Sequence, residues 1–184
     1  MMSIIAHTAR LLALPGIVVH ELAHYYFCLL AGARVHEVVF FRFGHPAGYV
    51  VHSAPRRFTA HLLISVGPLL VNSLLALLLF TLARVTYLDV ATSTLLEHHW
   101  SELAHLAVVA WLGLSVALQA LPSSGDATSL WQVTSWHLGR RHFLALAGVP
   151  VVGLIRLTNV LRAVFVDWIY AAVLAGLPWW LGSR

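Results

Sequence analysis

The residues of this chain that could carry out chemistry are concentrated in a short histidine and glutamate motif near its beginning. Residues 20–24 read His20-Glu21-Leu22-Ala23-His24, which is the pattern H-E-x-x-H. On an α-helix a spacing of four residues places both imidazoles on one face, where they can bind the same zinc ion. The glutamate between them can act as a general base beside that ion. We therefore expect His20 and His24 to be metal ligands and Glu21 to be a catalytic residue.

The motif lies inside an apolar run, and this location strengthens the functional interpretation. Within residues 11–33, Glu21 is the only Asp, Glu, Lys or Arg side chain. Ionisable groups are costly inside a membrane, and they usually face a polar interior where they serve a function. The alternative is a buried polar network that only joins helices, and it predicts no bound metal.

The composition of the whole chain is that of a membrane protein. Of its 184 residues, 60% are hydrophobic and 10% are charged, against about 25% charged in an ordinary soluble domain. The 11 basic residues are all arginines and are scattered along the chain, so we expect no nucleic-acid partner. The single cysteine excludes an intrachain disulfide and a cysteine zinc site.

Long uncharged runs predict the elements that must position the motif. Residues 11–33, 58–83 and 103–125 are each long enough to cross roughly 30 Å of hydrocarbon as a helix. Residues 143–182 predict two further membrane helices, at 143–161 and 163–182, with one span plus an interfacial helix as the alternative. Within them, Asp167 is expected to pair with Arg162 or to lie at an interface. We expect an all-α integral membrane protein, a bundle of about five transmembrane helices with more polar connections at 84–102 and 123–142.

The first two spans are separated by a segment of different character, at residues 35–52. Two runs rich in β-branched and aromatic residues, 35–43 and 49–51, flank a turn cluster at 44–48, and this pattern predicts a small membrane-associated β-hairpin. The connections after the first and third spans carry six arginines, against one after the second. The positive-inside rule therefore places those two connections in the cytoplasm and the N-terminus outside. The histidine motif then lies toward the cytoplasmic side.

Beyond the first motif, residues 10–135 resemble the site-two protease family of intramembrane zinc metalloproteases. The family's first core helix continues through positions occupied here by Cys28, Gly32 and Val35, with Cys28 in place of alanine. The remaining matches are Gly48-Tyr49-Val50 in the hairpin, Gly67-Pro68 followed by Asn72 in the second span, and Asp126 after the third span. Asn72 comes one residue later than in the family's pattern, and Gly125-Asp126 reverses the family's order.

The resemblance implies roles for these residues. Asp126 corresponds to the family's third zinc ligand, and Asn72, Gly48, Tyr49 and Val50 are expected to bind or position the substrate. Among the aspartates, Asp126 alone combines the expected depth with a backbone broken by proline and glycine. The alternative is that Asp126 caps a helix entered at Ala127, since aspartate is a favoured N-cap residue.

The resemblance also implies a function. It is that of a zinc-dependent endopeptidase with one zinc ion per chain, which hydrolyses peptide bonds in or next to transmembrane segments. The expected partners are a transmembrane protein or peptide substrate and the lipid bilayer. We expect a metalloprotease core at 1–136, followed by C-terminal membrane helices at 137–184. The alternative function is that of a non-enzymatic membrane metal-binding protein, a transporter or a sensor, that uses the histidine cluster.

Overall fold

The structure is a bundle of helices with one small sheet. The computed structural model describes residues 4–55, 57–92 and 99–183. The elements in chain order are α1 (Ile4–Leu30), β1 (Val35–Val39), β2 (Tyr49–His52), α2 (Phe58–Thr92), α3 (His99–Leu118), α4 (Ser124–Gly139), the short 3-10 helix η2 (Phe143–Ala147), α5 (Gly148–Leu161), the 3-10 turn η3 (Arg162–Val164) and α6 (Val166–Gly182). The expected helical architecture with a hairpin after the first helix is confirmed.

Among the described residues, four helical stretches are long and apolar enough to cross a membrane. They are His7–Leu30, Phe58–Thr92, Trp100–Leu118 and Phe143–Val164. The expectation of about five such helices is one too high for the described residues, because α6 has 17 residues and falls short of the roughly 20 that a span requires. The second helix is longer than the uncharged run predicted, since α2 continues past residue 83 to Thr92.

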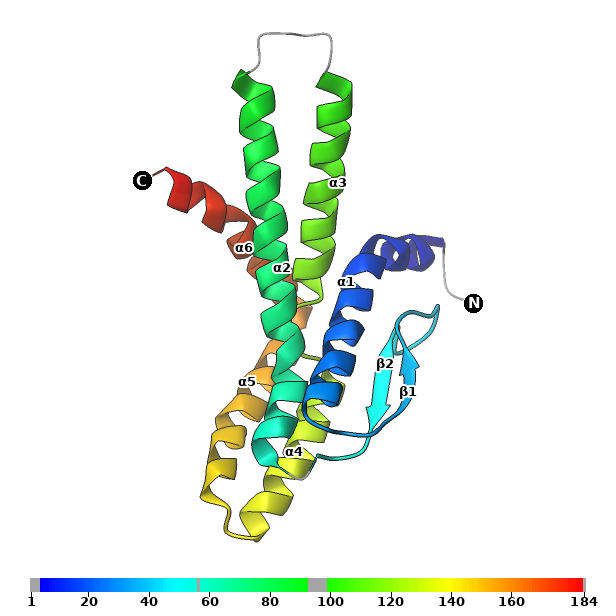
Figure 1. The fold of residues 1–184 in the computed structure, drawn as a ribbon, viewed down its shortest axis with the longest axis vertical. Coiled ribbons are helices and arrows are strands. Elements are labelled where there is room, and N and C mark those ends of the chain that lie inside the picture. Colours follow the sequence, from blue (N-terminus) through cyan, green and yellow to red (C-terminus); the bar gives the residue numbers. More distant parts are fainter. Residues whose placement is uncertain (1–3, 56, 93–98, 184) are drawn as a thin grey trace.

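Figure 1 shows how the helices are arranged. The long helices α2 and α3 pack side by side and extend beyond the rest of the molecule at one end. Helix α1 packs against the other half of α2, and the hairpin lies beside α1 (Figure 1). At the opposite end α4 and α5 form an antiparallel pair, and α6 leans away from α2 toward the C-terminus.

Helix α4 occupies a region that the sequence predicted as a polar connection, residues 123–142. The helix starts with a capping box, in which the Ser123 side chain accepts from the Asp126 N–H and the Asp126 side chain accepts from the Ser123 N–H. This arrangement satisfies two backbone donors at a helix start that have no partner within the helix. The apolar face of α4 then packs with α2 and α5 through Leu130, Phe58 and Val152. The expected domain boundary after residue 136 falls inside this helix.

The hairpin forms as the sequence predicts, with an antiparallel register that pairs Val38 with Val50 and Val39 with Tyr49. One of its faces packs on the end of α1, where Val35 and Val50 contact a buried cluster of Cys28, Ala33 and Ile64. This packing fixes the hairpin against the helix that carries the histidine motif.

Candidate metal centre

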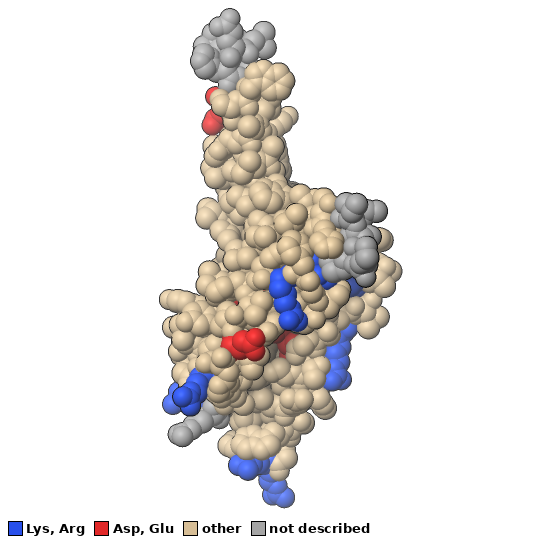
Figure 2. Space-filling model, turned by 90° about the vertical axis from the view of Figure 1, so that its right-hand side faces the viewer, with Lys and Arg blue, Asp and Glu red and all other residues tan. Residues whose placement is uncertain are grey.

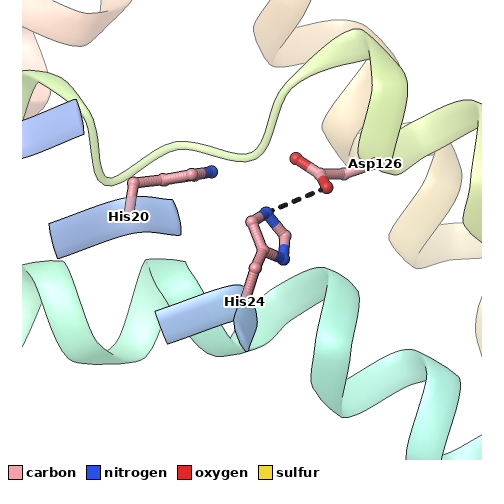
Figure 3. A group of neighbouring side chains, drawn as sticks. All are labelled: His20, His24 and Asp126. Carbon is pink, nitrogen blue, oxygen red and sulfur yellow. Dashed lines mark ion pairs between the residues drawn. The ribbon is translucent and has the colours of Figure 1, made fainter. Parts of the chain in front are cut away.

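The three expected metal ligands lie together in the structure. Helix α1 presents His20 and His24 on one face, with their ring centroids 4.8 Å apart, and Asp126 approaches from the first turn of α4 (Figure 3). His24 Nε2 lies 3.2 Å from Asp126 Oδ1. One ligand atom from each residue can be chosen so that all lie within 4.8 Å of one another. These groups can hold a metal ion.

Both imidazoles are held by their other ring nitrogen. His20 Nδ1 lies 2.7 Å from the carbonyl oxygen of Gln119, and His24 Nδ1 lies 2.9 Å from that of Ile64. A carbonyl can only accept, so each Nδ1 carries the proton and donates. In the neutral form of each ring the Nε2 atom then has a free electron pair for a metal ion, whereas protonated His24 donates from Nε2 to Asp126. Hydrogen bonds of this kind fix the tautomer and the ring orientation of metal-binding histidines.

The carbonyl that orients His24 is free because of a proline. In a regular helix the oxygen of Ile64 would accept from the N–H of residue 68, four positions later. Residue 68 is Pro68, which has no N–H, so this helical bond cannot form. The Gly67-Pro68 pair, noticed in the sequence only through the family resemblance, thus has a local physical role. It leaves an acceptor inside α2 for the histidine of α1.

Asp126 uses its two carboxylate oxygens for different purposes. Oδ2 accepts hydrogen bonds from Ser123 N and Ser123 Oγ, both at 2.7 Å, whereas Oδ1 faces His24. The alternative that Asp126 is the N-cap of a helix entered at Ala127 is wrong, because α4 starts at Ser124 and its N-cap residue is Ser123. Asp126 takes part in the cap as the third helical residue and still presents Oδ1 to His24. Burial by itself would raise the pKa of the Asp126 carboxyl, but the hydrogen bond and charge of His24, with the Ser123 contact, lower it to about 2. The group is consequently ionised, as a metal ligand must be.

Glu21 lies next to the ligands in the same cavity. This space, which we call the central cavity, has a volume of about 750 Å³ and is lined by α1, the hairpin, α2, the start of α4 and the segment between α3 and α4. Glu21 is buried and borders it together with His20, His24 and Asp126. Gly48 packs directly on this glutamate, because a Cβ atom at residue 48 would lie 2.6 Å from Glu21 Cγ. Only glycine leaves room for the glutamate here.

The other expected substrate-binding residues divide into two groups. Gly48, Tyr49 and Val50 line the central cavity. The Tyr49 hydroxyl donates to Glu37 across the hairpin, and this hydrogen bond raises the pKa of the tyrosine. Asn72 differs from the expectation, because it is fully buried among the helices and does not line the cavity.

Asn72 instead contacts the backbone behind the site. Its Nδ2 lies 3.2 Å from the Gln119 oxygen, 3.3 Å from that of Val116 and 3.4 Å from that of Gly16. The Gln119 oxygen is the same atom that accepts from His20 Nδ1. Asn72 thus faces α1 and α3, where it contacts the carbonyl that orients His20.

Two residues that the sequence analysis did not assign to the site hold the α3–α4 loop, which we define as residues 119–123. Arg162 Nη2 donates to the Leu121 oxygen at 3.0 Å, and Asn159 Nδ2 lies 3.3 Å from the Pro122 oxygen. Arg162 is oriented in turn by Asp167 and by Asn159, each at 3.2 Å. The expected Arg162–Asp167 pair is thus confirmed. An arginine inside an apolar run was the only sequence signal for this contact.

Comparisons with known proteins add no relative. No family model, no curated protein and no solved structure matches this chain.

Proposed function

We propose that this protein is a zinc-dependent endopeptidase that cleaves peptide bonds in or next to transmembrane segments. The observation that carries the proposal is the placement of Glu21 beside His20, His24 and Asp126 in one cavity. Two histidine ligands from one helix and a carboxylate ligand from another form the donor set of a hydrolytic zinc site. The glutamate between the histidines is the base that such a site uses.

The donor set supports zinc as the metal. Catalytic zinc sites combine histidine nitrogen and carboxylate oxygen from three protein ligands and leave one position for water or substrate. In a tetrahedral site with zinc–ligand distances of about 2.0–2.2 Å, neighbouring ligand atoms lie about 3.3–3.6 Å apart. The 3.2 Å between His24 Nε2 and Asp126 Oδ1 is close to that edge length.

The residues of the chain then have separate tasks in the reaction. A zinc ion held by His20, His24 and Asp126 would supply Lewis acidity toward a water molecule and a substrate carbonyl. Glu21 accepts the proton of the attacking water and delivers it to the leaving amine. Gly48 and the first residues of β2 border the same cavity and can hold an extended substrate by β-augmentation, because a helical peptide hides its carbonyl carbons.

The proposed substrate class follows from the surroundings of the site. His20, Glu21 and His24 lie in a helix that is long and apolar enough to span a membrane, and the cavity gives water a route to them. We assign the cavity to the cytoplasmic side. Arg57 precedes α2, whose first half borders the cavity, and Arg140 and Arg141 follow α4, which starts at the cavity and ends at the same end of the molecule as the start of α2 (Figure 1).

The decisive experiment measures zinc and cleavage on the same purified samples. The chain in detergent is expected to contain one zinc ion and to cleave a model transmembrane peptide. Glu21→Gln is nearly isosteric and leaves the ligands intact, so it should retain zinc and lose at least about a hundredfold in cleavage rate. Glu102→Gln, an exposed glutamate on α3, is the matched control. Full cleavage by Glu21→Gln would refute the proposal, and bound zinc without any cleavage by the unmodified chain would favour a non-enzymatic metal-binding protein.

A further inference from the structure

One face of α1 continues the central cavity well beyond the metal ligands. Arg10, Ala13, Ile17 and Glu21 are spaced by three, four and four residues, so they form a single stripe along the helix. All four line the cavity. Arg10 therefore lies on the same wall as Glu21, eleven residues and about 16 Å farther along the helix axis. The cavity is an elongated groove with the metal site at one part and an arginine at another.

Arg10 is half-buried, and one nitrogen of its guanidinium is without a hydrogen-bond partner among the described residues. Its Nη1 is buried, and within the part of the chain that the structure describes it has no hydrogen-bond partner. The helix that carries it is long and apolar enough to span a membrane. A charge in such a place is expensive unless it is paired, and arginine keeps its charge at any physiological pH.

The described cavity wall offers no free carboxylate to Arg10. The acidic side chains that line the cavity are Glu21 and Asp126. Glu21 is three helical turns away, and Asp126 is engaged by Ser123 and His24. A molecule that enters the cavity can therefore supply an anion to Arg10.

We propose that Arg10 forms a subsite for an acidic side chain of the substrate, an aspartate or a glutamate. This inference rests on the proposed function, because it takes the cavity to be the place where a peptide binds. An extended peptide advances about 3.3 Å per residue, so a span of about 16 Å corresponds to about five residues. The acidic residue then lies about five positions from the bond that is cleaved. A carboxylate fits because guanidinium binds it through two parallel hydrogen bonds.

Figure 2 shows the face of the molecule that carries the hairpin. An acidic patch lies on this surface beside a hollow in which further acidic atoms are visible, and basic side chains lie next to the hollow (Figure 2). The hollow on this face is thus bordered by charges of both signs.

The test scans one aspartate along a model transmembrane peptide. Peptides carry a single Asp, or Asn as the neutral control, at each position up to eight residues on either side of the cleaved bond. Binding is measured by fluorescence anisotropy to the Glu21→Gln variant, and cleavage is measured with the unmodified chain, both in uncharged detergent. We expect Asp about five residues from the cleaved bond to improve binding and kcat/KM about ten- to hundredfold over Asn, which corresponds to a charge-assisted hydrogen bond.

A charge exchange makes the result specific to Arg10. Arg10→Glu should lose the preference for Asp and gain one for Lys at the same peptide position, whereas Arg10→Lys should keep part of the preference for Asp. Arg140→Glu, which changes an arginine that does not line the cavity, is the matched control and should leave the preference unchanged. Gain of binding by the exchanged pair cannot be explained by a misfolded variant.

The outcomes separate this subsite from the proposed protease activity. Cleavage by the unmodified chain without an Asp preference at any position would overturn the subsite and leave the protease intact. An Arg10-dependent Asp preference in binding, without cleavage of any peptide, would support the subsite and refute the protease. If Arg10→Ala weakened all peptides equally and anionic lipid restored binding to the unmodified chain only, Arg10 would bind a lipid headgroup, and the proposal would be wrong.

Discussion

Helix α1 and the α3–α4 loop both determine the metal centre, but they are held in place by different means. The helix sets the separation of His20 and His24 through its own backbone hydrogen bonds. The loop has no regular structure, and side chains from other elements contact three of its carbonyl oxygens: Asn72 at Gln119, Arg162 at Leu121 and Asn159 at Pro122. The helix alone sets the spacing of its two ligands along the chain, whereas the loop presents Asp126 only within the folded bundle.

Because of this difference, the geometry of the metal site depends on the packing of the whole fold. The contacts to the loop come from α2, α5 and η3, so the C-terminal helices take part in the site although they carry no ligand. One of the histidines depends on the same loop, because His20 donates to its first carbonyl. Loss of the loop geometry would therefore affect two of the three ligands.

The largest effect on zinc binding is expected when Asp126, the ligand that follows the α3–α4 loop, is changed. Asp126→Asn should keep its side-chain oxygen on Ser123 and turn its amide nitrogen toward His24, where a donor cannot bind a metal ion. Asp126→Ala removes both functions. Zinc affinity, measured by chelator competition, should fall more than about a hundredfold in both variants, which exceeds the usual effect of changing a supporting residue.

The same two variants should differ in stability. Asp126→Ala loses the cap of α4 and should lower the free energy of unfolding of the zinc-free protein by about 1 kcal/mol relative to Asp126→Asn. Thermal unfolding in the presence of a chelator measures this difference. Full zinc binding by both variants would show that Asp126 is not the third ligand.

An intermediate effect on zinc binding is expected when a contact that supports the α3–α4 loop is removed. Arg162→Met keeps much of the side-chain length but removes the donor to Leu121, and it should weaken zinc binding about ten- to hundredfold. The visible absorption of the cobalt-substituted protein should change as well, because the ligand geometry changes and not only the stability. Arg156→Met, an exposed arginine on α5, is the control and should behave like the unmodified chain. An unaltered cobalt spectrum in Arg162→Met would mean that the loop holds its shape without this contact.

The smallest effect on zinc binding is expected when the contact that orients His24 of α1 is disturbed. Pro68→Ala restores an N–H that can donate to Ile64, so this donor competes with His24 Nδ1 for the same oxygen. A carbonyl has two electron pairs and can accept twice, so zinc binding should weaken less than about tenfold. Pro178→Ala, the same change inside α6, serves as the reference. A loss as large as that of Arg162→Met would show that α1 depends on outside support as much as the loop does.

The sequence predicts those parts of the molecule whose structure depends on residues close together in the chain. The hairpin and the geometry of His20 and His24 follow from short patterns, and both are found in the structure. The sequence offered a helix entered at Ala127, with Asp126 as its cap, only as an alternative to a polar connection. The helix starts three residues earlier, at Ser124, because the capping box pairs Ser123 with Asp126. The extent of α2 was underestimated because Arg84 and Asp89 were taken as the start of a connection.

The support of the site could not be predicted for a different reason. Asn159 and Arg162 contact carbonyls that lie 37 and 41 residues earlier in the chain. A sequence pattern cannot show which backbone oxygens accept these hydrogen bonds, since every residue has one. The orientation of Asn72 depends in the same way on the backbones of α1 and α3. These contacts become visible only when the helices are packed.

The contacts to the α3–α4 loop also have an evolutionary consequence. Because they end on main-chain oxygens, the side chains at Leu121 and Pro122 can be exchanged for others of similar size while the hydrogen bonds persist. An insertion or deletion of one residue would change which carbonyls meet Arg162 and Asn159, and it would shift Asp126 relative to His24. We expect this stretch of the chain to accept substitutions over generations but to conserve its length.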